Sequence, residues 1–119
     1  MERLSKYDIV LMDLEPTRGA EKRGLRPCLI LQSNRFNLSA IQTVAVAPIT
    51  SHLRDYIPLL TINASKENGL KKDSCVDLSQ IRTMDKSRYR GTLGHLESQY
   101  HKTVMEKVSI VLDIGDQYK

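Results

Sequence analysis

The segment TRGAEKRGLRP, residues 17–27, gathers positive charge in a way that suits phosphate chemistry. Its cations are Arg18, Lys22, Arg23 and Arg26, with Glu21 as the one acid among them. Arg26 differs from the others because it lies between Leu25 and Pro27 at the mouth of a predicted strand, and a side chain on a rigid element can be aimed. We expect Arg26 to act on a phosphate. The other cations either steer an anion toward it or belong to an ordinary solvated loop.

A second candidate is PITSH, residues 48–52, at the end of a predicted buried strand. Thr50, Ser51 and His52 stand together there, and hydroxyls at strand ends commonly bind oxyanions. The alternative is a polar turn that follows the strand.

The third candidate is SQIRTMDKSR, residues 79–88, which holds Gln80 and Arg82 before a predicted short helical turn. The functional interpretation gives both side chains a role in binding. The alternative is that Asp85 pairs with a nearby cation and holds the turn.

The histidines His52, His95 and His101 prompt a comparison with enzymes that use paired imidazoles, one to take a 2′-hydroxyl proton and one to serve the leaving group. We expect His101 to lie on a solvated helix face and His95 to be structural. Only His52 adjoins another candidate site.

These side chains must be positioned by short strands and one helix. Apolar and β-branched runs predict strands over 7–14, 28–33, 42–50, 56–62, 74–81 and 89–96. The segment 28–33 opens with a short continuous apolar run, which suits a strand buried on both faces. The tail then changes to a helical period, with apolar positions Leu96, Tyr100, Val104, Val108, Val111 and Leu112. We expect Ser98 to cap this helix and Gly115 to end it. The predicted fold is mainly β, a small closed or half-closed barrel of five to seven strands with a C-terminal helix.

The chain has 119 residues, so we expect one domain over 1–119. Its net charge is +4, and the segments 17–27 and 81–90 each carry a net +3, so the basic character belongs to two short stretches. This balance favours a polyanionic partner. With five Tyr, one Phe and no Trp, an aromatic platform for base stacking is not expected.

Cys28 and Cys75 both lie in apolar runs, without the spacing of a zinc site. We therefore expect free buried thiols, no metal and no cofactor. There is no signal-like apolar core near the first residue and no membrane-length apolar run. We expect a cytoplasmic protein that makes no membrane contact.

The three candidate segments, in this order, resemble the MazF/PemK family of toxin–antitoxin endoribonucleases over nearly the whole chain. The pattern D-x-x-P-x-x-G-x-E-x-x-G-x-R-P is complete as Asp13, Pro16, Gly19, Glu21, Gly24, Arg26 and Pro27. VAVAPITS resembles the family strand that ends in Ile-Thr, and DSCVDLSQIRTMDKSRYRGTLGHL resembles its third block.

The resemblance implies an SH3-like barrel that works as a homodimer and cleaves single-stranded RNA without metal. The 2′-hydroxyl would attack the adjacent phosphate, leaving a 2′,3′-cyclic phosphate and a 5′-hydroxyl. Arg26 and Thr50 match catalytic positions of many members, Glu21 a supporting acid, and Gln80 a position suited to contacting a base. The implied partner is an antitoxin with an acidic, partly disordered tail.

The sequence departs from some plasmid-borne members, which carry a His in the first loop and an Arg-x-Asp before the third block. Here Ala20 and Asp77-Leu78-Ser79 stand at those places. The general base is therefore not fixed by the resemblance, and His52 and Glu21 are its candidates.

Two other functions fit the same fold. CcdB-like toxins bind gyrase through C-terminal aromatic and apolar residues, whereas this chain ends DIGDQYK without Trp. A non-catalytic nucleic-acid-binding module would retain Arg26 for phosphate binding alone.

Overall fold

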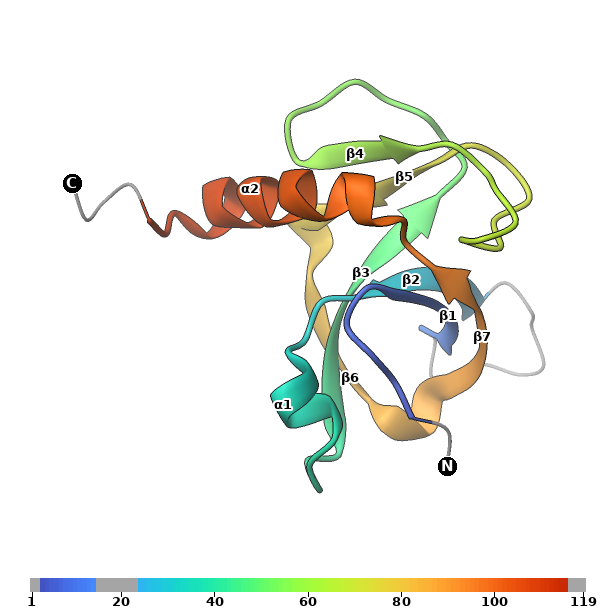
Figure 1. The fold of residues 1–119 in the computed structure, drawn as a ribbon, viewed down its shortest axis with the longest axis vertical. Coiled ribbons are helices and arrows are strands. Elements are labelled where there is room, and N and C mark those ends of the chain that lie inside the picture. Colours follow the sequence, from blue (N-terminus) through green and yellow to red (C-terminus); the bar gives the residue numbers. More distant parts are fainter. Residues whose placement is uncertain (1–2, 15–23, 116–119) are drawn as a thin grey trace.

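The computed structural model describes residues 3–14 and 24–115. Its strands are β1 Asp8–Asp13, β2 Leu25–Ile30, β3 Thr43–Thr50, β4 Leu59–Ile62, β5 Ser74–Asp77, β6 Arg82–Asp85 and β7 Tyr89–His95 (Figure 1). The helices are α1 Asn34–Asn37 and α2 His101–Leu112, and short 3-10 turns occupy Leu78–Gln80 (η2), Lys86–Arg88 (η3) and Ser98–Tyr100 (η4). The predicted fold class, mainly β with a C-terminal helix, is confirmed.

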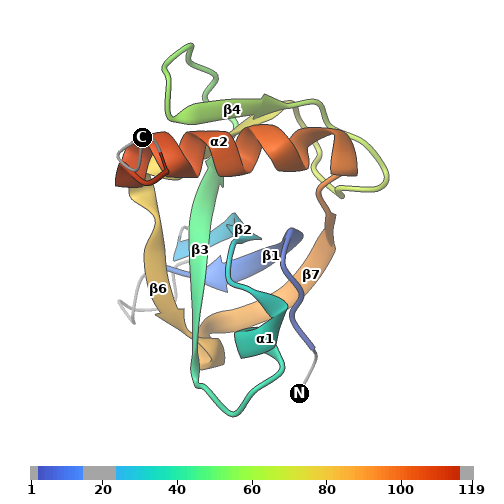
Figure 2. The same ribbon diagram turned by 60° about the vertical axis from the view of Figure 1, so that its left-hand side comes forward.

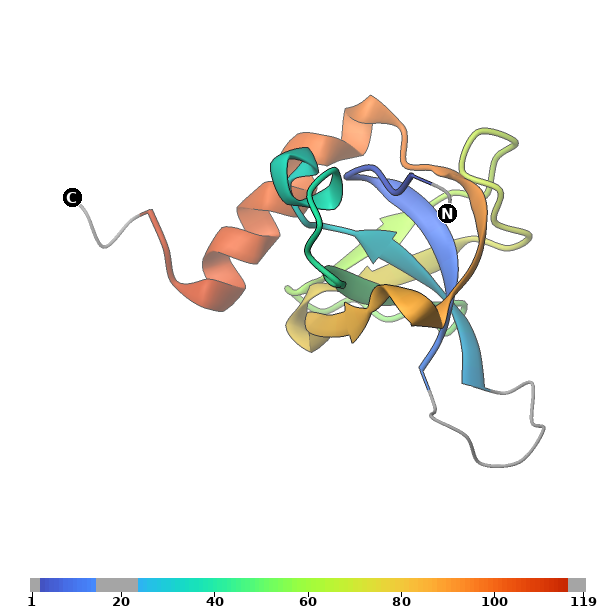
Figure 3. The same cartoon turned by 90° about the horizontal axis from the view of Figure 1, so that it is seen from below.

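The strands form an antiparallel sheet in the order β4-β5-β3-β2-β1-β7, and β6 pairs with the first half of β3. Strand β3 therefore joins two parts of this sheet, one with β6, β2, β1 and β7 and the other with β5 and β4. Seen from below, β1 (blue) and β7 (orange) curve side by side (Figure 3). The strand path does not close on itself within the described residues, so the barrel is half-closed.

The central strands β1, β2 and β3 contribute buried side chains to clusters on both faces of the sheet. On one face Ile9, Leu29 and Ala47 join a cluster that includes Val104 and Val108 of α2. Their neighbours in sequence point the other way, and a second cluster contains Val10, Met12, Cys28, Ile30, Val44 and Val46. Helix α2 covers the first cluster on the side of β4, away from α1 (Figure 2). The apolar run that begins at Cys28 is thus buried on both faces, as predicted.

Several predicted boundaries are wrong in ways that matter for the site. Strand β2 begins at Leu25, three residues before the expected start, so Arg26 lies inside it. The expected strand 74–81 ends at Asp77, because the Asp77 carboxylate accepts from the Ser79 amide and starts the turn η2. A separate strand, β6, follows that turn.

The ends of the C-terminal helix also differ from the prediction. Ser98 begins the turn η4, and α2 starts at His101 without a side-chain cap. The helix ends at Leu112 because Asp113 adopts a left-handed conformation with φ 57°, which a short polar side chain tolerates. The expected cap Ser98 and the expected stop Gly115 are therefore both wrong.

His101 is structural, contrary to the expectation of a solvated side chain. Its ring stacks on Tyr7 with centroids 3.6 Å apart, and its Nε2 lies 2.8 Å from the Leu96 carbonyl oxygen. A carbonyl only accepts, so Nε2 carries a hydrogen. Tyr7 has a positive φ of 76° and is fixed by hydrogen bonds to Ile30 and Leu96. The pair joins the start of β1 to α2.

Candidate active site

A pocket of about 580 Å³ brings the two strongest candidates together. Arg26 and Pro27 reach it from β2, and Thr50 and Ser51 from the end of β3. The β2–β3 ladder ends at the pair of Cys28 with Pro48. Beyond that pair the partners change: Arg26 pairs with Met12 of β1, and Thr50 pairs with Cys75 of β5.

The pocket exists because β2 and β3 diverge at this point. Beyond Pro48, β3 follows β5 through the pairs Ile49–Val76 and Thr50–Cys75, whereas β2 stays with β1 as far as Leu25–Asp13. Proline has no amide hydrogen to donate, and Pro27 and Pro48 stand one in each strand where the ladder ends. Space therefore opens between two rigid strands, and Arg26 and Thr50 flank it.

The Arg26 guanidinium is exposed and has one hydrogen-bond partner among the described residues. Its Nη1 donates to the neighbouring Leu25 carbonyl at 2.9 Å, and it forms no ion pair with any residue in the described ranges. A guanidinium has five N–H donors, so most remain available. Arg26 can therefore present two parallel donors to a phosphate.

The hydroxyl of Thr50 is oriented by a hydrogen bond from a backbone amide. Its Oγ1 accepts from the His52 amide at 3.1 Å, which leaves the hydroxyl hydrogen free to donate. That donor suits an anionic oxygen in the pocket.

The structure adds two pocket residues that sequence reasoning missed, Lys71 and Lys72. They come from the segment between β4 and β5, and the pair of lysines in GLKKD was the available signal. The apolar part of the pocket lining includes Leu11, Leu25, Ile49, Leu70 and Leu93. Three cations and no carboxylate line the pocket within the described residues, so its field favours an anion.

Other predicted site residues lie elsewhere. His52 is exposed and does not line the pocket. Gln80 in η2 and Arg82 in β6 are exposed and also stand outside it. Arg18, Glu21, Lys22 and Arg23 fall outside the described residues.

The second basic stretch is mostly structural. Asp13 pairs with Arg88 at 3.8 Å and with Arg90 at 3.6 Å. The Lys86 ammonium is buried and donates to the Asn37 carbonyl. Asp85 holds the turn η3 by accepting from the Ser87 amide at 2.8 Å, and its pKa is lowered by these Ser87 hydrogen bonds and by the Arg88 charge. The proposed pairing of Asp85 is thus chiefly with a backbone amide.

Both cysteines are free and buried, as expected. Burial raises the pKa of the Cys28 thiol to about 12, although the Arg82 charge opposes the effect. Cys28 is therefore a thiol, not a nucleophilic thiolate, near neutral pH. Among residues 3–14 and 24–115, no helix is long and apolar enough to span a membrane.

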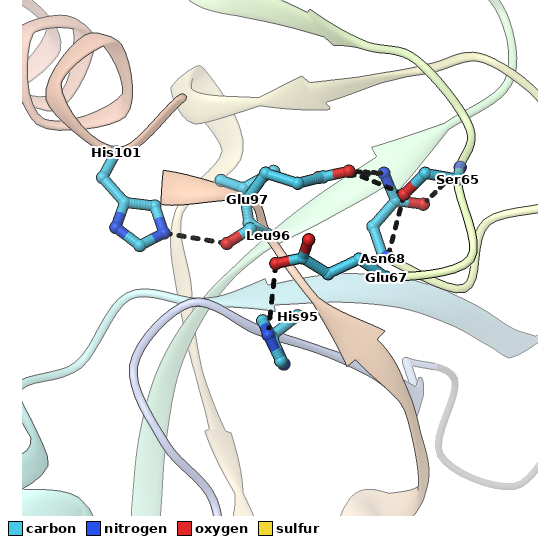
Figure 4. Close-up of polar contacts among 7 residues, drawn as sticks. All are labelled: Ser65, Glu67, Asn68, His95, Leu96, Glu97 and His101. Carbon is cyan, nitrogen blue, oxygen red and sulfur yellow. Dashed lines mark hydrogen bonds and ion pairs between the residues drawn. The ribbon is translucent and has the colours of Figure 1, made fainter. Parts of the chain in front are cut away.

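The segment that carries the lysines is anchored by a polar network (Figure 4). Asn68 is fully buried and donates to the Asn63 carbonyl and to the Glu97 carboxylate, while its Oδ1 accepts from the amides of Ser65 and Leu70. Ser65 Oγ donates to Glu97 at 2.6 Å. His95 lies 3.3 Å from Glu67, and both side chains are at least half exposed, so the structural role expected for His95 stays a prediction.

The Glu97 anchor should weaken in acid. Burial acts to raise the pKa of Glu97, but hydrogen bonds from Ser65, its own backbone and Asn68 outweigh burial and hold the pKa below its ordinary value. A lowered folded-state pKa gives stability that is present above the unfolded-state pKa and lost as the pH falls through the folded-state pKa. Glu97→Gln should therefore reduce the fall in melting temperature between about pH 7 and about pH 3.

Thermal unfolding across this range checks the prediction. The control is Glu106→Gln, an exposed carboxylate on α2 that should leave the pH dependence unchanged. An identical acid response in the wild type and Glu97→Gln would contradict the role of this anchor.

Solved structures place the half-closed barrel in a known class. The toxin MazF-mt6 of Mycobacterium tuberculosis aligns with a TM-score of 0.77 at 23% identity, covering 91% of this chain and 98% of that chain. A MazE–MazF structure from Deinococcus radiodurans aligns at 0.79 and 22% identity, covering 97% and 100%. These likenesses establish the fold.

The chain belongs to the PemK-like, MazF-like toxins of type II toxin–antitoxin systems, whose family model matches residues 5–112. Endoribonuclease EndoA of Bacillus subtilis is 35% identical over 117 residues, covering 95% of this chain and 97% of the relative. Endoribonuclease MazF of Staphylococcus saprophyticus is 36% identical over 112 residues, covering 93% and 92%. The family resemblance seen in the sequence is thereby confirmed.

Proposed function

We propose that this chain, as a single toxin domain over 1–119, is an endoribonuclease that cuts single-stranded RNA. One observation carries the proposal: Arg26 and Thr50, which lie far apart in sequence, flank one pocket whose charged lining is cationic. The names of the two relatives described above, both endoribonucleases, support it.

The pocket fits a transesterification that needs no metal. The ribose 2′-hydroxyl attacks the adjacent phosphorus, the bond from phosphorus to the 5′-oxygen breaks, and the products carry a 2′,3′-cyclic phosphate and a 5′-hydroxyl. The phosphorane gains negative charge, which Arg26 stabilises through two donors at once. Thr50 donates to a phosphate oxygen or orients the 2′-hydroxyl. The hydroxyl proton passes to a base, for which Glu21 and His52 are the candidates, although His52 stands beside the pocket and not in its lining. The leaving 5′-oxygen takes up a proton from water.

The remaining predicted contacts belong to a longer stretch of RNA. Arg82 pairs with Val46, four residues from Thr50 along β3, which is about 13 Å along a strand. We assign Gln80 and Arg82 to nucleotides beyond the cut, and Ser51 to the phosphate at the cut. Arg18, Lys22 and Arg23 steer the RNA, and Glu21 supports Arg26.

We further propose a homodimer in the cytoplasm, inhibited by an antitoxin whose acidic tail covers the cationic pocket. The solved neighbours support such a partner: one is a MazE–MazF structure, and another is a mycobacterial endoribonuclease in complex with its cognate antitoxin. An acidic tail matches a pocket that is lined by Arg26, Lys71 and Lys72.

Incubation of the purified protein with mixed-sequence single-stranded RNA in EDTA tests the function. We expect discrete cuts with 5′-hydroxyl and cyclic-phosphate ends. RNA that stays intact with a folded protein would contradict the proposal. Gyrase inhibition by the same sample would then indicate a CcdB-like toxin, and RNA binding without cutting would indicate a binding module.

A further inference from the structure

Lys71 and Lys72 are cations with no assigned role. Both are exposed and both line the pocket that holds Arg26 and Thr50. Neither has an ion-pair partner among residues 3–14 and 24–115. The neighbouring acid, Asp73, accepts a hydrogen bond from the Ala64 amide at 2.8 Å and forms no ion pair with either lysine. Two exposed ammonium groups without an ion-pair partner among the described residues give this side of the pocket a positive potential, which attracts an anionic ligand.

The backbone beneath these lysines is fixed from both sides. On the N-terminal side, Leu70 is buried and its amide donates to Asn68 Oδ1 at 3.0 Å. On the C-terminal side, Ser74 Oγ donates to the Lys72 carbonyl at 2.8 Å, and Ser74 begins β5. The side chains of Lys71 and Lys72 therefore project from a rigid backbone, which limits the conformational entropy that is lost on binding.

Close backbone packing fixes the same segment against β7. Gly69 has a φ of 73° and lies so close to the Leu93 carbonyl that a Cβ there would clash. Gly94 in turn leaves no room for a Cβ beside the backbone of Glu67 and Asn68. The lysine segment and β7, which together with β2 and β3 surround the pocket, thus behave as one packed unit.

We propose that Lys71 and Lys72 bind RNA phosphates adjacent to the one held by Arg26, an inference that rests on the proposed function. The lysines reach the pocket from the β4–β5 segment, whereas Arg26 reaches it from β2, so successive phosphates of one strand are held from different walls. Lys is a mobile point charge that suits such a phosphate, whereas the flat guanidinium of Arg26 suits the reacting group. The lysines bind substrate and do not take part in the chemical step.

The test compares Lys71→Ala, Lys72→Ala and the double variant with the matched control Lys66→Ala. Lys66 is exposed on the same segment, outside the pocket, and its removal lowers the net charge by the same amount as either single lysine variant. The binding probe is a mixed-sequence single-stranded RNA with 2′-O-methyl riboses, which cannot be cut. Cleavage of the unmodified RNA gives kcat and KM, and melting temperatures check folding.

We expect the double variant to bind about tenfold or more weakly. The slope of log K against log salt should be smaller by about 1.4, because each phosphate that a lysine neutralises contributes about 0.7 to that slope in single-stranded nucleic acid. KM should rise while kcat stays near the wild-type value, and Lys66→Ala should match the wild type. Affinity and slope equal to those of Lys66→Ala would overturn the proposal. So would unchanged RNA binding with abolished binding of a polyglutamate peptide, which would assign the lysines to an acidic protein tail.

Failure of the lysine assignment can be distinguished from failure of the proposed function. If the wild type cuts RNA and Arg26→Ala does not, while the double lysine variant keeps its RNA affinity, the proposed function stands and the lysine assignment falls. If the folded wild type neither binds nor cuts RNA, both fall.

Discussion

Arg26→Ala should lower the rate of RNA cleavage by at least about 100-fold, because removal of one aimed donor group at a developing charge costs this much in comparable sites. The guanidinium is exposed and bonds only its neighbour's carbonyl among the described residues. Its removal should therefore leave the melting temperature almost unchanged. Single-turnover cleavage and thermal unfolding of the same sample measure both quantities.

Two further variants separate charge from geometry. Arg26→Lys keeps the charge but loses the two parallel donors, so its rate should fall between those of the wild type and Arg26→Ala. Arg35→Ala removes an exposed arginine of α1 that does not line the pocket, and it should cut RNA normally. If a folded Arg26→Ala protein cleaved RNA at the wild-type rate, Arg26 would take no part in the chemical step.

Asn68→Ala should lower the free energy of unfolding by about 2–3 kcal/mol, because buried groups left without a partner cost about 1–3 kcal/mol each. The side chain is fully buried and satisfies the amides of Ser65 and Leu70 and the carbonyl of Asn63. The substitution leaves these backbone groups without a hydrogen-bond partner and also removes a donor from Glu97. Urea unfolding followed by circular dichroism gives the change.

The control is Asn63→Ala, which removes an exposed amide side chain five residues away and should change stability by less than about 0.5 kcal/mol. An effect of Asn68→Ala no larger than that of Asn63→Ala would show that the network does not hold the segment.

Much of the site could be predicted from local sequence, because Arg26 and Thr50 stand in strands whose apolar patterns are strong. Their meeting across the pocket depends on register and on the divergence of β2 from β3, and no single segment encodes either. The lysines were missed for a related reason. Lys71 and Lys72 line the pocket because their segment is fixed by contacts that the local sequence does not show: Asn68 bonds Glu97 from a distant segment, and Gly69 packs against β7.

The errors in the rest of the chain have local physical causes. His101 looked solvated from its position in the helix, but a contact with Tyr7, 94 residues earlier in the chain, buries one face of its ring. The strand expected over 74–81 alternates convincingly, yet the Asp77 side chain competes for the backbone amide of Ser79 and starts a turn. Sequence periodicity does not reveal either interaction.

The most direct test of the central claim is to locate bound RNA on the protein. Amide NMR spectra of labelled protein would be recorded with an RNA whose ribose at the mapped cut is 2′-O-methylated, so that it binds without reacting. We predict the largest shifts at Arg26, Thr50, Ser51, Lys71 and Lys72. Shifts confined to α1 or α2, with these amides unmoved, would contradict an RNA site between β2 and β3.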